Sequence, residues 1–194
     1  MTKLIQYASL HATPWKNGGG STTEITVFPP GATFDDFDWR ISLATITQSG
    51  PFSVFPGIDR SLSLVDGAGV VLDVGNERRV ALSDREPIVA FPGEIEVHAT
   101  VDGGMTTDFN VMTRRAQCNH QLERRVVRDF STLERRSETT IVFLAEGESL
   151  TLISGSERIS MVRYDAAVLE KEDVWTLESG HATVFIVDIF PNDE

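Results

Sequence analysis

Short strand-forming segments recur along this chain between Gly, Pro and Asp residues, and this pattern restricts the chain to an all-β fold. β-branched and aromatic residues favour strands, whereas Gly, Pro and Asp mark the turns between them. Helical periodicity is scarce, and its best candidate, residues 120–136, suits an irregular strand and connector equally well. The expected strands cover residues 22–28, 39–46, 61–65, 69–74, 87–91, 107–112, 140–145, 149–154 and 182–190.

A gapless internal repeat relates the two halves of the chain. A shift of 80 residues superimposes Leu64 on Leu144, Gly67 on Gly147, Leu72 on Leu152, Gly75 on Gly155, Glu77 on Glu157 and Arg78 on Arg158. Both segments read as strand, Gly turn, strand, Gly turn and charged pair, with equal hairpin lengths, which is typical of a duplicated β unit.

Duplicated hairpin units fit two jelly-roll (double-stranded β-helix) barrels in one chain. The segment LSLVDGAGVVLDVGNERRVALSDREPIVAFPGEIEVHA at 62–99 resembles the core of a cupin, so the expected architecture is a bicupin. We expect an N-terminal cupin-like barrel over residues 1–118 that carries the ligand pocket, and a structural C-terminal barrel over residues 119–194. One large β-sandwich or another closed β-barrel is the alternative.

The charge and the composition limit the kinds of partner that this protein can bind and the compartment in which it works. The formal net charge of −12 opposes binding to nucleic acid or to an anionic membrane. Cys118 is the only cysteine, so no internal disulfide forms, and the N-terminal residues lack the continuous apolar segment of an export signal. We therefore expect a cytoplasmic protein without nucleic-acid or membrane partners, and a homodimer formed through exposed sheet edges.

The sequence lacks the recognised catalytic and metal-binding patterns. Catalytic cupins hold a metal ion through a His-x-His pair, a carboxylate and a further His, but the corresponding positions fall near Ser53, Phe55 and Arg60. The four histidines are dispersed, and only His98, after a Phe-Pro-Gly turn, is kept as an inward-pointing candidate. P-loop and nucleophile-elbow motifs are also absent, so we expect no metal, no cofactor and no assigned catalytic residue.

Three consecutive glycines, Gly18 to Gly20, follow Trp15, Lys16 and Asn17. Glycine loses more conformational freedom on folding than any other residue, so an ordered run of three needs a structural or functional reason. One interpretation is a surface turn. The other is a ligand-facing loop, with Lys16 as cation, Asn17 as amide and Trp15 as apolar wall.

Polar side chains alternate with apolar ones on three expected strands. Period two places Asp108, Asn110, Met112 and Arg114 on one face of their strand, and Glu24 and Arg40 lie on similar strands. If these faces line a barrel, they form a mixed-charge pocket with Lys16 and Asn17 that suits a small carboxylate. An exposed polar face on a half-buried strand is the alternative.

These motifs together resemble the HutD/Ves family over almost the whole chain, most specifically before residue 120. The resembling segments are PWKNGGGSTTEI at 14–25, DFDWRISLATI at 36–46, GPFSVFPGIDRSLSLVDGAGVVL at 50–72, AFPGE at 90–94 and DFNVMTRR at 108–115. The resemblance implies a bicupin fold and no settled activity. It maps the ligand pocket onto Trp15, Lys16, Asn17, Glu24, Arg40, Asp108, Asn110, Met112 and Arg114.

Some members of that family are associated with histidine utilisation and are thought to bind a metabolite such as urocanate or a formylated glutamate, while others are associated with environmental stress. The resemblance and the residues together favour a metal-free, small-molecule-binding bicupin that binds a small carboxylate metabolite in a regulatory or sequestering role. The alternative is a metal-independent hydrolase or isomerase, with Glu24 or Asp108 as general base and Lys16 as electrostatic stabiliser. A third hypothesis is a protein-interaction module built on the Arg-rich segment 114–136.

Overall fold

The computed structural model describes residues 2–76, 78–83, 87–170 and 173–192. Within these ranges the chain forms seventeen strands and one short 3-10 helix, η1 (Tyr7–Ser9), which confirms the all-β expectation. No helix in the described ranges is long and apolar enough to cross a membrane. Glu77, which the repeat alignment uses, lies outside the described residues. The chain divides into two compact units, which are described separately below.

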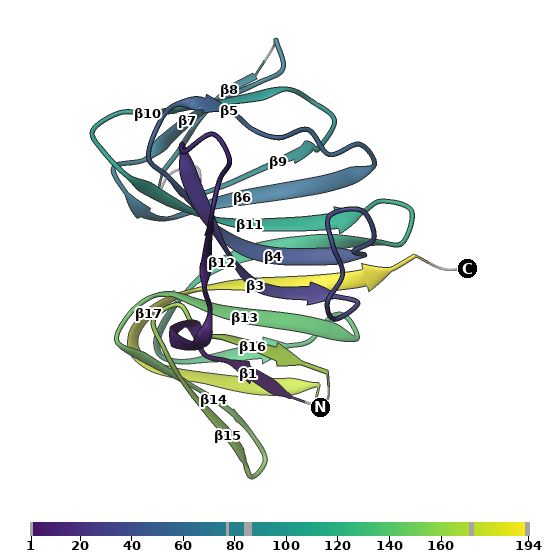
Figure 1. The fold of residues 1–194 in the computed structure, drawn as a ribbon. Helices are drawn as coiled ribbons and strands as arrows, with labels where there is room; N and C mark the ends of the chain where they lie inside the picture. Colours follow the sequence, from purple (N-terminus) through teal and green to yellow (C-terminus); the bar gives the residue numbers. More distant parts are fainter. Residues whose placement is uncertain (1, 77, 84–86, 171–172, 193–194) are drawn as a thin grey trace. The chain divides into compact units, whose positions relative to one another are not determined.

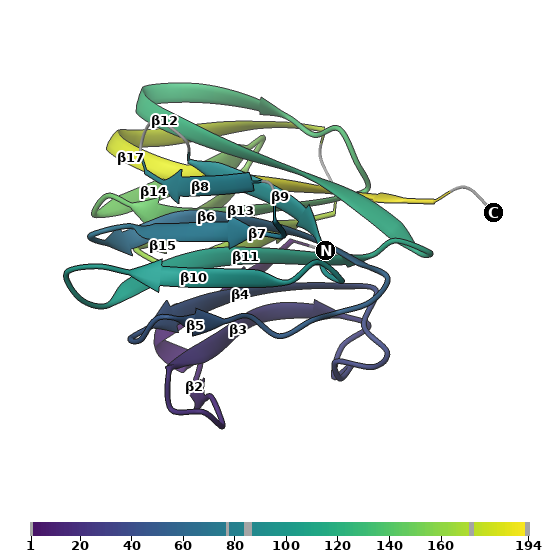
Figure 2. The ribbon, with the colours of Figure 1, turned by 90° about the horizontal axis from the view of Figure 1, so that it is seen from above.

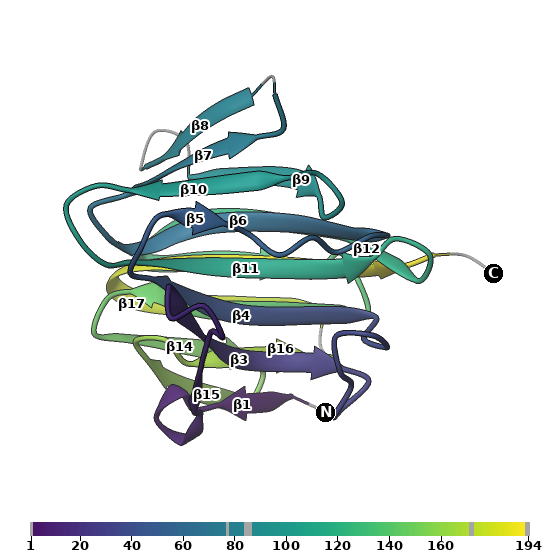
Figure 3. The ribbon, with the colours of Figure 1, turned by 45° about the horizontal axis from the view of Figure 1, so that its top comes forward.

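Unit 2, His11–Asn119, contains a six-stranded sheet of order β2-β3-β4-β11-β6-β9 and a four-stranded sheet of order β5-β10-β7-β8. The central strand β11 lies between β4 and β6 in Figure 1, and β10 lies beside β7 in Figure 3. The strands are β2 (Ala12–Pro14), β3 (Gly20–Phe28), β4 (Trp39–Ile46), β5 (Gly50–Pro51), β6 (Ile58–Gly67), β7 (Val70–Val74), β8 (Arg78–Leu82), β9 (Ile88–Pro92), β10 (Val97–Val101) and β11 (Thr106–Arg114).

The two sheets of unit 2 bury a common apolar core. Leu62 and Val89 from the larger sheet cluster with Leu72, Val80 and Val97 from the smaller one. Each strand alternates buried and less buried residues, as in β7, because successive side chains point to opposite faces of a sheet. Residues that point between the sheets therefore line a barrel-like interior.

Unit 1, Met1–Leu10 with His120–Glu194, contains one seven-stranded sheet of order β1-β16-β13-β17-β14-β15, in which β12 also pairs with β17 (Figure 2). Buried side chains from β12 to β17 form one apolar cluster, so this sheet curves around its own core. The strands are β1 (Lys3–Ile5), β12 (Cys118–Glu134), β13 (Thr139–Glu146), β14 (Ser149–Ser154), β15 (Glu157–Val162), β16 (Ala166–Leu169) and β17 (Val174–Pro191).

The internal repeat coincides with a shared pairing scheme. β6 pairs with β9 and β11, as β13 pairs with β16 and β17, and the hairpin β7–β8 corresponds to β14–β15. Gly67 and Gly147 have φ of 105° and 116°, and a Cβ at either would lie within 2.7 Å of a backbone carbonyl oxygen. Glycine is therefore required at the same place in both units.

The equal hairpin length implied by the gapless alignment is wrong by one residue. Val74 pairs with Arg78, whereas Ser154 pairs with Glu157, so the second hairpin has the shorter connection. Register in a hairpin is fixed by the length of its turn, and the two turns differ although both begin with a glycine at positive φ.

Two sequence-based alternatives are decided by pairing. Residues 120–136 are not helical, because residues 118–134 form β12 and pair with β17. β1 pairs with β16, so residues 1–10 group with unit 1, whereas the expected N-terminal barrel began at residue 1. The division into two separate cupin barrels stays a prediction.

Candidate functional site

The inner face of the larger sheet in unit 2 carries an unusual set of polar residues. Directly opposed residues of antiparallel strands lie on the same face. Leu62 and Val89 belong to the core, and Asn110 is opposite Leu62 on one side and Ser42 on the other, so Asn110 and Ser42 point inward. Register and period two extend this face to Arg40, Arg60, Asp108 and Met112. We call Arg40, Ser42, Arg60, Asp108 and Asn110 the interior cluster.

Arg60 is the most constrained member of the interior cluster. Its exposed fraction is 8%, and its guanidinium carbon lies 5.2, 5.3 and 5.5 Å from the ring centroids of Phe91, Phe52 and Phe55. Aromatic faces attract a cation, and more strongly where water is excluded. Three phenylalanine rings therefore surround this buried charge.

The hydrogen bonds of Arg60 are few and long. Nη2 donates to Asn110 Oδ1 at 3.3 Å, Nη1 donates to the carbonyl oxygen of Ser53 at 3.5 Å, and Nε has no partner. Burial, reinforced by the positive charge of Arg40, lowers the pKa of Arg60 to about 10, so the guanidinium remains charged near neutral pH. No carboxylate among the described residues forms an ion pair with it.

Arg40 lies on β4 beside this charge, but it has a carboxylate partner. Its Nε donates to Glu24 Oε2 at 2.8 Å, and the side chain of Glu24 is 44% exposed. The ring of Phe34 covers the Arg40 guanidinium at 4.6 Å and stacks on Phe55 at 5.6 Å. One aromatic pair thus covers both arginines.

Asp108 differs from the other buried carboxylates of the described residues. Asp165 accepts hydrogen bonds from the backbone N–H of Tyr7 and Val162, and Asp188 accepts one from the hydroxyl of Thr140. Asp108 has no exposed surface, and neither carboxylate oxygen has a partner. Burial alone raises the pKa of Asp108 from 3.8 to about 7.

Met112 and Arg114 continue the same strand but differ in what they contact. Met112 is fully buried and clusters with Phe37 and Ile58. The guanidinium of Arg114 donates to the carbonyl oxygens of Phe37 at 2.8 Å and Asp35 at 2.9 Å. Arg114 therefore holds the connection between β3 and β4, which carries Phe34.

The glycine run forms the turn between β2 and β3, and its closest contacts are structural. Asn17 Oδ1 accepts a hydrogen bond from the backbone N–H of Gly19 at 3.0 Å, and Gly18 has φ of 73°. A Cβ at Gly20 would lie 2.3 Å from the carbonyl oxygen of Thr45 and 3.0 Å from the Trp15 ring. The run therefore allows Trp15 to pack against the core of unit 2.

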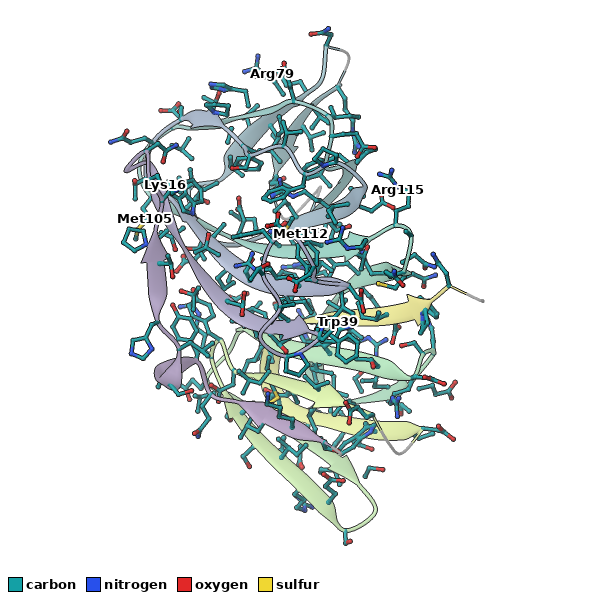
Figure 4. All side chains as sticks on the ribbon, turned by 45° about the vertical axis from the view of Figure 1, so that its right-hand side comes forward. Lys16, Trp39, Arg79, Met105, Met112 and Arg115 are labelled. Carbon is teal, nitrogen blue, oxygen red and sulfur yellow. The ribbon has the colours of Figure 1, made fainter. Side chains whose placement is uncertain are left out.

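Lys16 and Asn17 are exposed in this turn, away from the arginines. Gly20 is opposite Ile46 at one end of β4, and Arg40 lies six residues along that strand, or about 20 Å. Figure 4 likewise separates Lys16 from Met112 and Arg115. The structure thus groups Arg40, Asp108, Asn110 and Met112, with Glu24 at the rim, and leaves Lys16 and Asn17 at the opposite end of β4 from Arg40.

The interior cluster does not fit a metal ion. Arg60 occupies a position where the cupin spacing places a ligand, and a guanidinium has no lone pair to donate and would repel a cation. The expectation that His98 points inward is wrong: it is exposed, because it alternates with buried Val97 and Ala99 on β10. Among the residues with described placement, no group of three or more His, Cys, Asp and Glu side chains could hold a metal.

The sequence-based prediction missed Arg60 and Ser42 as inner residues. The sequence pattern identified Arg60 only as a residue at a position expected for a metal ligand, and it did not single out Ser42. The register of β6 against β11 identifies Arg60, because it is opposite Met112 on the inner face. Alternation of Arg60 with Leu62 and Leu64 was the available signal.

Comparison with known proteins agrees with this fold. The structure of a conserved protein of unknown function from Pseudomonas aeruginosa PAO1 superimposes with a TM-score of 0.90 at 27% identity, covering 98% of this chain and 99% of that one. The structure of HutD from Pseudomonas fluorescens SBW25 superimposes with a TM-score of 0.83 at 24% identity, over the full length of both chains. A mutant of oxalate decarboxylase from Bacillus subtilis superimposes with a TM-score of 0.65 at 8% identity, covering 98% of this chain and 77% of that one. This similarity shows a cupin-like fold alone.

Sequence relatives give the family. Protein Ves of Cronobacter sakazakii (strain ATCC BAA-894) is 40% identical over 134 residues, which cover 69% of this chain and 70% of that protein. The model of the HutD family matches residues 7–186. Because that match spans most of the sequence, the chain belongs to the HutD family.

Proposed function

We propose that the chain is a metal-free, small-molecule-binding bicupin of the HutD/Ves type that binds a small carboxylate metabolite inside unit 2. Its role is regulatory or sequestering. The pairing scheme shared by the two units supports the bicupin architecture. The observation that carries the binding proposal is the buried guanidinium of Arg60, which has no carboxylate partner among the described residues.

A buried charge is strongly unfavourable unless an opposite charge and hydrogen bonds compensate it. Arg60 has one free Nε–H group and two long hydrogen bonds, and the charge of Arg40 adds repulsion. A carboxylate supplies what is missing, because its two oxygens accept parallel hydrogen bonds from one guanidinium. The bound anion would also relieve the repulsion between the two arginines.

The surroundings favour a small carboxylate. Asn110 Oδ1 accepts a hydrogen bond from Arg60, and the side-chain NH2 group of Asn110 can donate to the same anion. Phe52, Phe55 and Phe91 surround the guanidinium and keep water away from it, which strengthens charge-assisted hydrogen bonds. The family context adds histidine-degradation intermediates to the candidates, and one HutD structure was determined in a formate condition.

Calorimetric titration with formate, N-formylglutamate and urocanate tests this proposal. We expect saturable binding of at least one acid, and at least tenfold weaker binding to Arg60→Met, because a hydrogen bond to a charged group contributes about 1.5–3 kcal/mol. Arg115→Gln is the matched control, since Arg115 is an exposed arginine paired with Asp59 and Glu94. Unchanged binding in Arg60→Met would contradict the proposal.

A catalytic role is the second candidate, and the carboxylate of Asp108 favours it. A buried carboxylate with a pKa of about 7 has the proton affinity of a general base near neutral pH. Glu24 suits this role less well because it is exposed and paired with Arg40. Turnover of the same acids in chelator-treated buffer, lost in Asp108→Asn while binding persists, would establish catalysis.

A further inference from the structure

The two oxygens of Asp108 are the strongest unexplained feature of the interior. A buried polar group without a hydrogen bond is unfavourable by about 1–3 kcal/mol, and native proteins rarely leave one unsatisfied. Here both oxygens of one carboxylate lack partners, and so does the hydroxyl of Ser42 on the adjacent strand. Ser42 is opposite Asn110, so both groups lie next to the amide that contacts Arg60.

The sheet itself offers Asp108 no donor. Its direct neighbours across β4 and β6 are Ala44 and Leu64, whose side chains are apolar. Met112, which is opposite both Arg40 and Arg60, lies four residues along β11 from Asp108, or about 13 Å. The acceptor is therefore separate from the arginine end of the interior cluster.

Trp15 lies at the same end of the inner face as Asp108. Its indole Nε1–H donates to Thr22 Oγ1 at 2.8 Å, and Thr22 is opposite Ala44, which is itself opposite Asp108. The Trp15 ring packs on the core and on Gly20. The Asp108 end of this row is thus covered by an aromatic ring instead of being open to water.

The spacing of residues along β11 gives the distance between Asp108 and Asn110, which contacts Arg60. Asp108 and Asn110 are two residues apart on one face, which corresponds to about 7 Å. A carboxylate placed at Arg60 and Asn110 therefore brings a second group, a few bonds away, to Asp108.

We propose that the ligand is bifunctional: its carboxylate binds Arg60 and Asn110, and a nitrogen donor on the same molecule, an ammonium or N–H group, binds Asp108 and Ser42. This inference rests on the proposed carboxylate site and adds a second, donor-specific subsite. It predicts selection for carboxylates that carry a nitrogen donor a few bonds from the acid group, as amino acids with a terminal ammonium do.

A matched ligand series tests the donor subsite. 4-Aminobutyrate and pentanoate have equal chain length, and only the first has a terminal ammonium, while formate reports the carboxylate end alone. Titration calorimetry with the full-length protein should show 4-aminobutyrate binding at least tenfold more tightly than pentanoate. Asp108→Asn should reduce this preference at least fivefold and leave the formate affinity within twofold. Asp108→Leu, which removes the acceptor entirely, should abolish the preference.

The outcomes separate the two proposals. Equal affinities for 4-aminobutyrate and pentanoate, with formate still bound, would overturn the donor subsite and leave the carboxylate site in place. Loss of formate binding in Asp108→Asn would also overturn it, because Asp108 would then belong to the carboxylate end. Failure of every acid to bind the unmodified protein would overturn the carboxylate site, and the donor subsite with it.

Discussion

Replacing Asp108 with asparagine should stabilise the ligand-free protein, and the gain should grow with pH. The carboxyl group has a pKa of about 7 in the folded protein because it is fully buried, against 3.8 for an ordinary aspartate. The folded state holds the proton up to about pH 7, whereas the unfolded chain releases it near pH 3.8. The free energy of unfolding therefore falls as the pH rises between these values and is level above about 7.

The magnitude follows from the two pKa values. At 1.36 kcal/mol per pKa unit, the interval from 3.8 to about 7 gives a loss of about 4 kcal/mol at pH 8. At pH 5 the same relation gives about 1.5 kcal/mol. Asparagine keeps the shape and does not ionise, so the stability difference between Asp108→Asn and the unmodified protein should grow by about 2.5 kcal/mol from pH 5 to pH 8.

Urea unfolding of both proteins at several pH values, followed by circular dichroism, measures this difference, in which all other titrating groups cancel. Asp36→Asn is a useful control because a hydrogen bond from Thr33 lowers the pKa of Asp36 below 3.8, so its stability difference should change only below about pH 5 and stay level from pH 5 to pH 8. An NMR titration of the Asp108 carboxyl carbon gives the pKa directly. A stability difference that is the same at pH 5 and pH 8 would refute the reasoning.

Three further outcomes follow from the packing. Gly20→Ala should lower the free energy of unfolding in urea by about 2–4 kcal/mol, because the new Cβ would lie 2.3 Å from a carbonyl oxygen. Gly50→Ala, where the Cβ would meet open space, should change it by under about 0.5 kcal/mol, and equal effects of the two substitutions would contradict this reasoning. Burial raises the pKa of Cys118 to about 11, so iodoacetamide should modify it roughly 100-fold more slowly at pH 8 than in urea, and equal rates would argue against the burial. Arg60→Met should raise the unfolding free energy of the ligand-free protein by about 1–4 kcal/mol in urea unfolding, while formate binding is lost. A loss of stability would show instead that the protein itself compensates the charge of Arg60.

Strand positions were predictable because alternation of side chains is a local property. Residues 39–46 and 149–154 were expected as strands and form β4 and β14 with the same bounds. Residues 120–136 stayed ambiguous between helix and strand, since their β-branched residues weaken a helix without excluding it. The pairing of β12 with β17, which is a long-range contact, makes this segment a strand.

The candidate site was predictable in part for the same reason. Period two placed Asp108, Asn110 and Met112 on one face, and the register of β11 against β4 and β6 agrees. Whether that face points into the protein or toward solvent depends on where the second sheet packs. No local sequence pattern specifies that packing. Arg60 was missed because a buried arginine is rare, and an arginine among apolar residues reads as an edge or surface position.

The sequence by itself determined the all-β class, the repeated strand–glycine pattern and the alternation on β11, because each depends on neighbours a few residues apart. Tertiary structure alone decided the role of the glycine run and the composition of the interior cluster. Gly20 is required by the Trp15 ring and by the Thr45 carbonyl on the paired strand. Arg60 and Asn110, 50 residues apart, meet only through strand pairing. Burial then turns these ordinary polar residues into an uncompensated charge and an unpartnered carboxylate, because removal of water leaves each without the hydrogen bonds it would otherwise have.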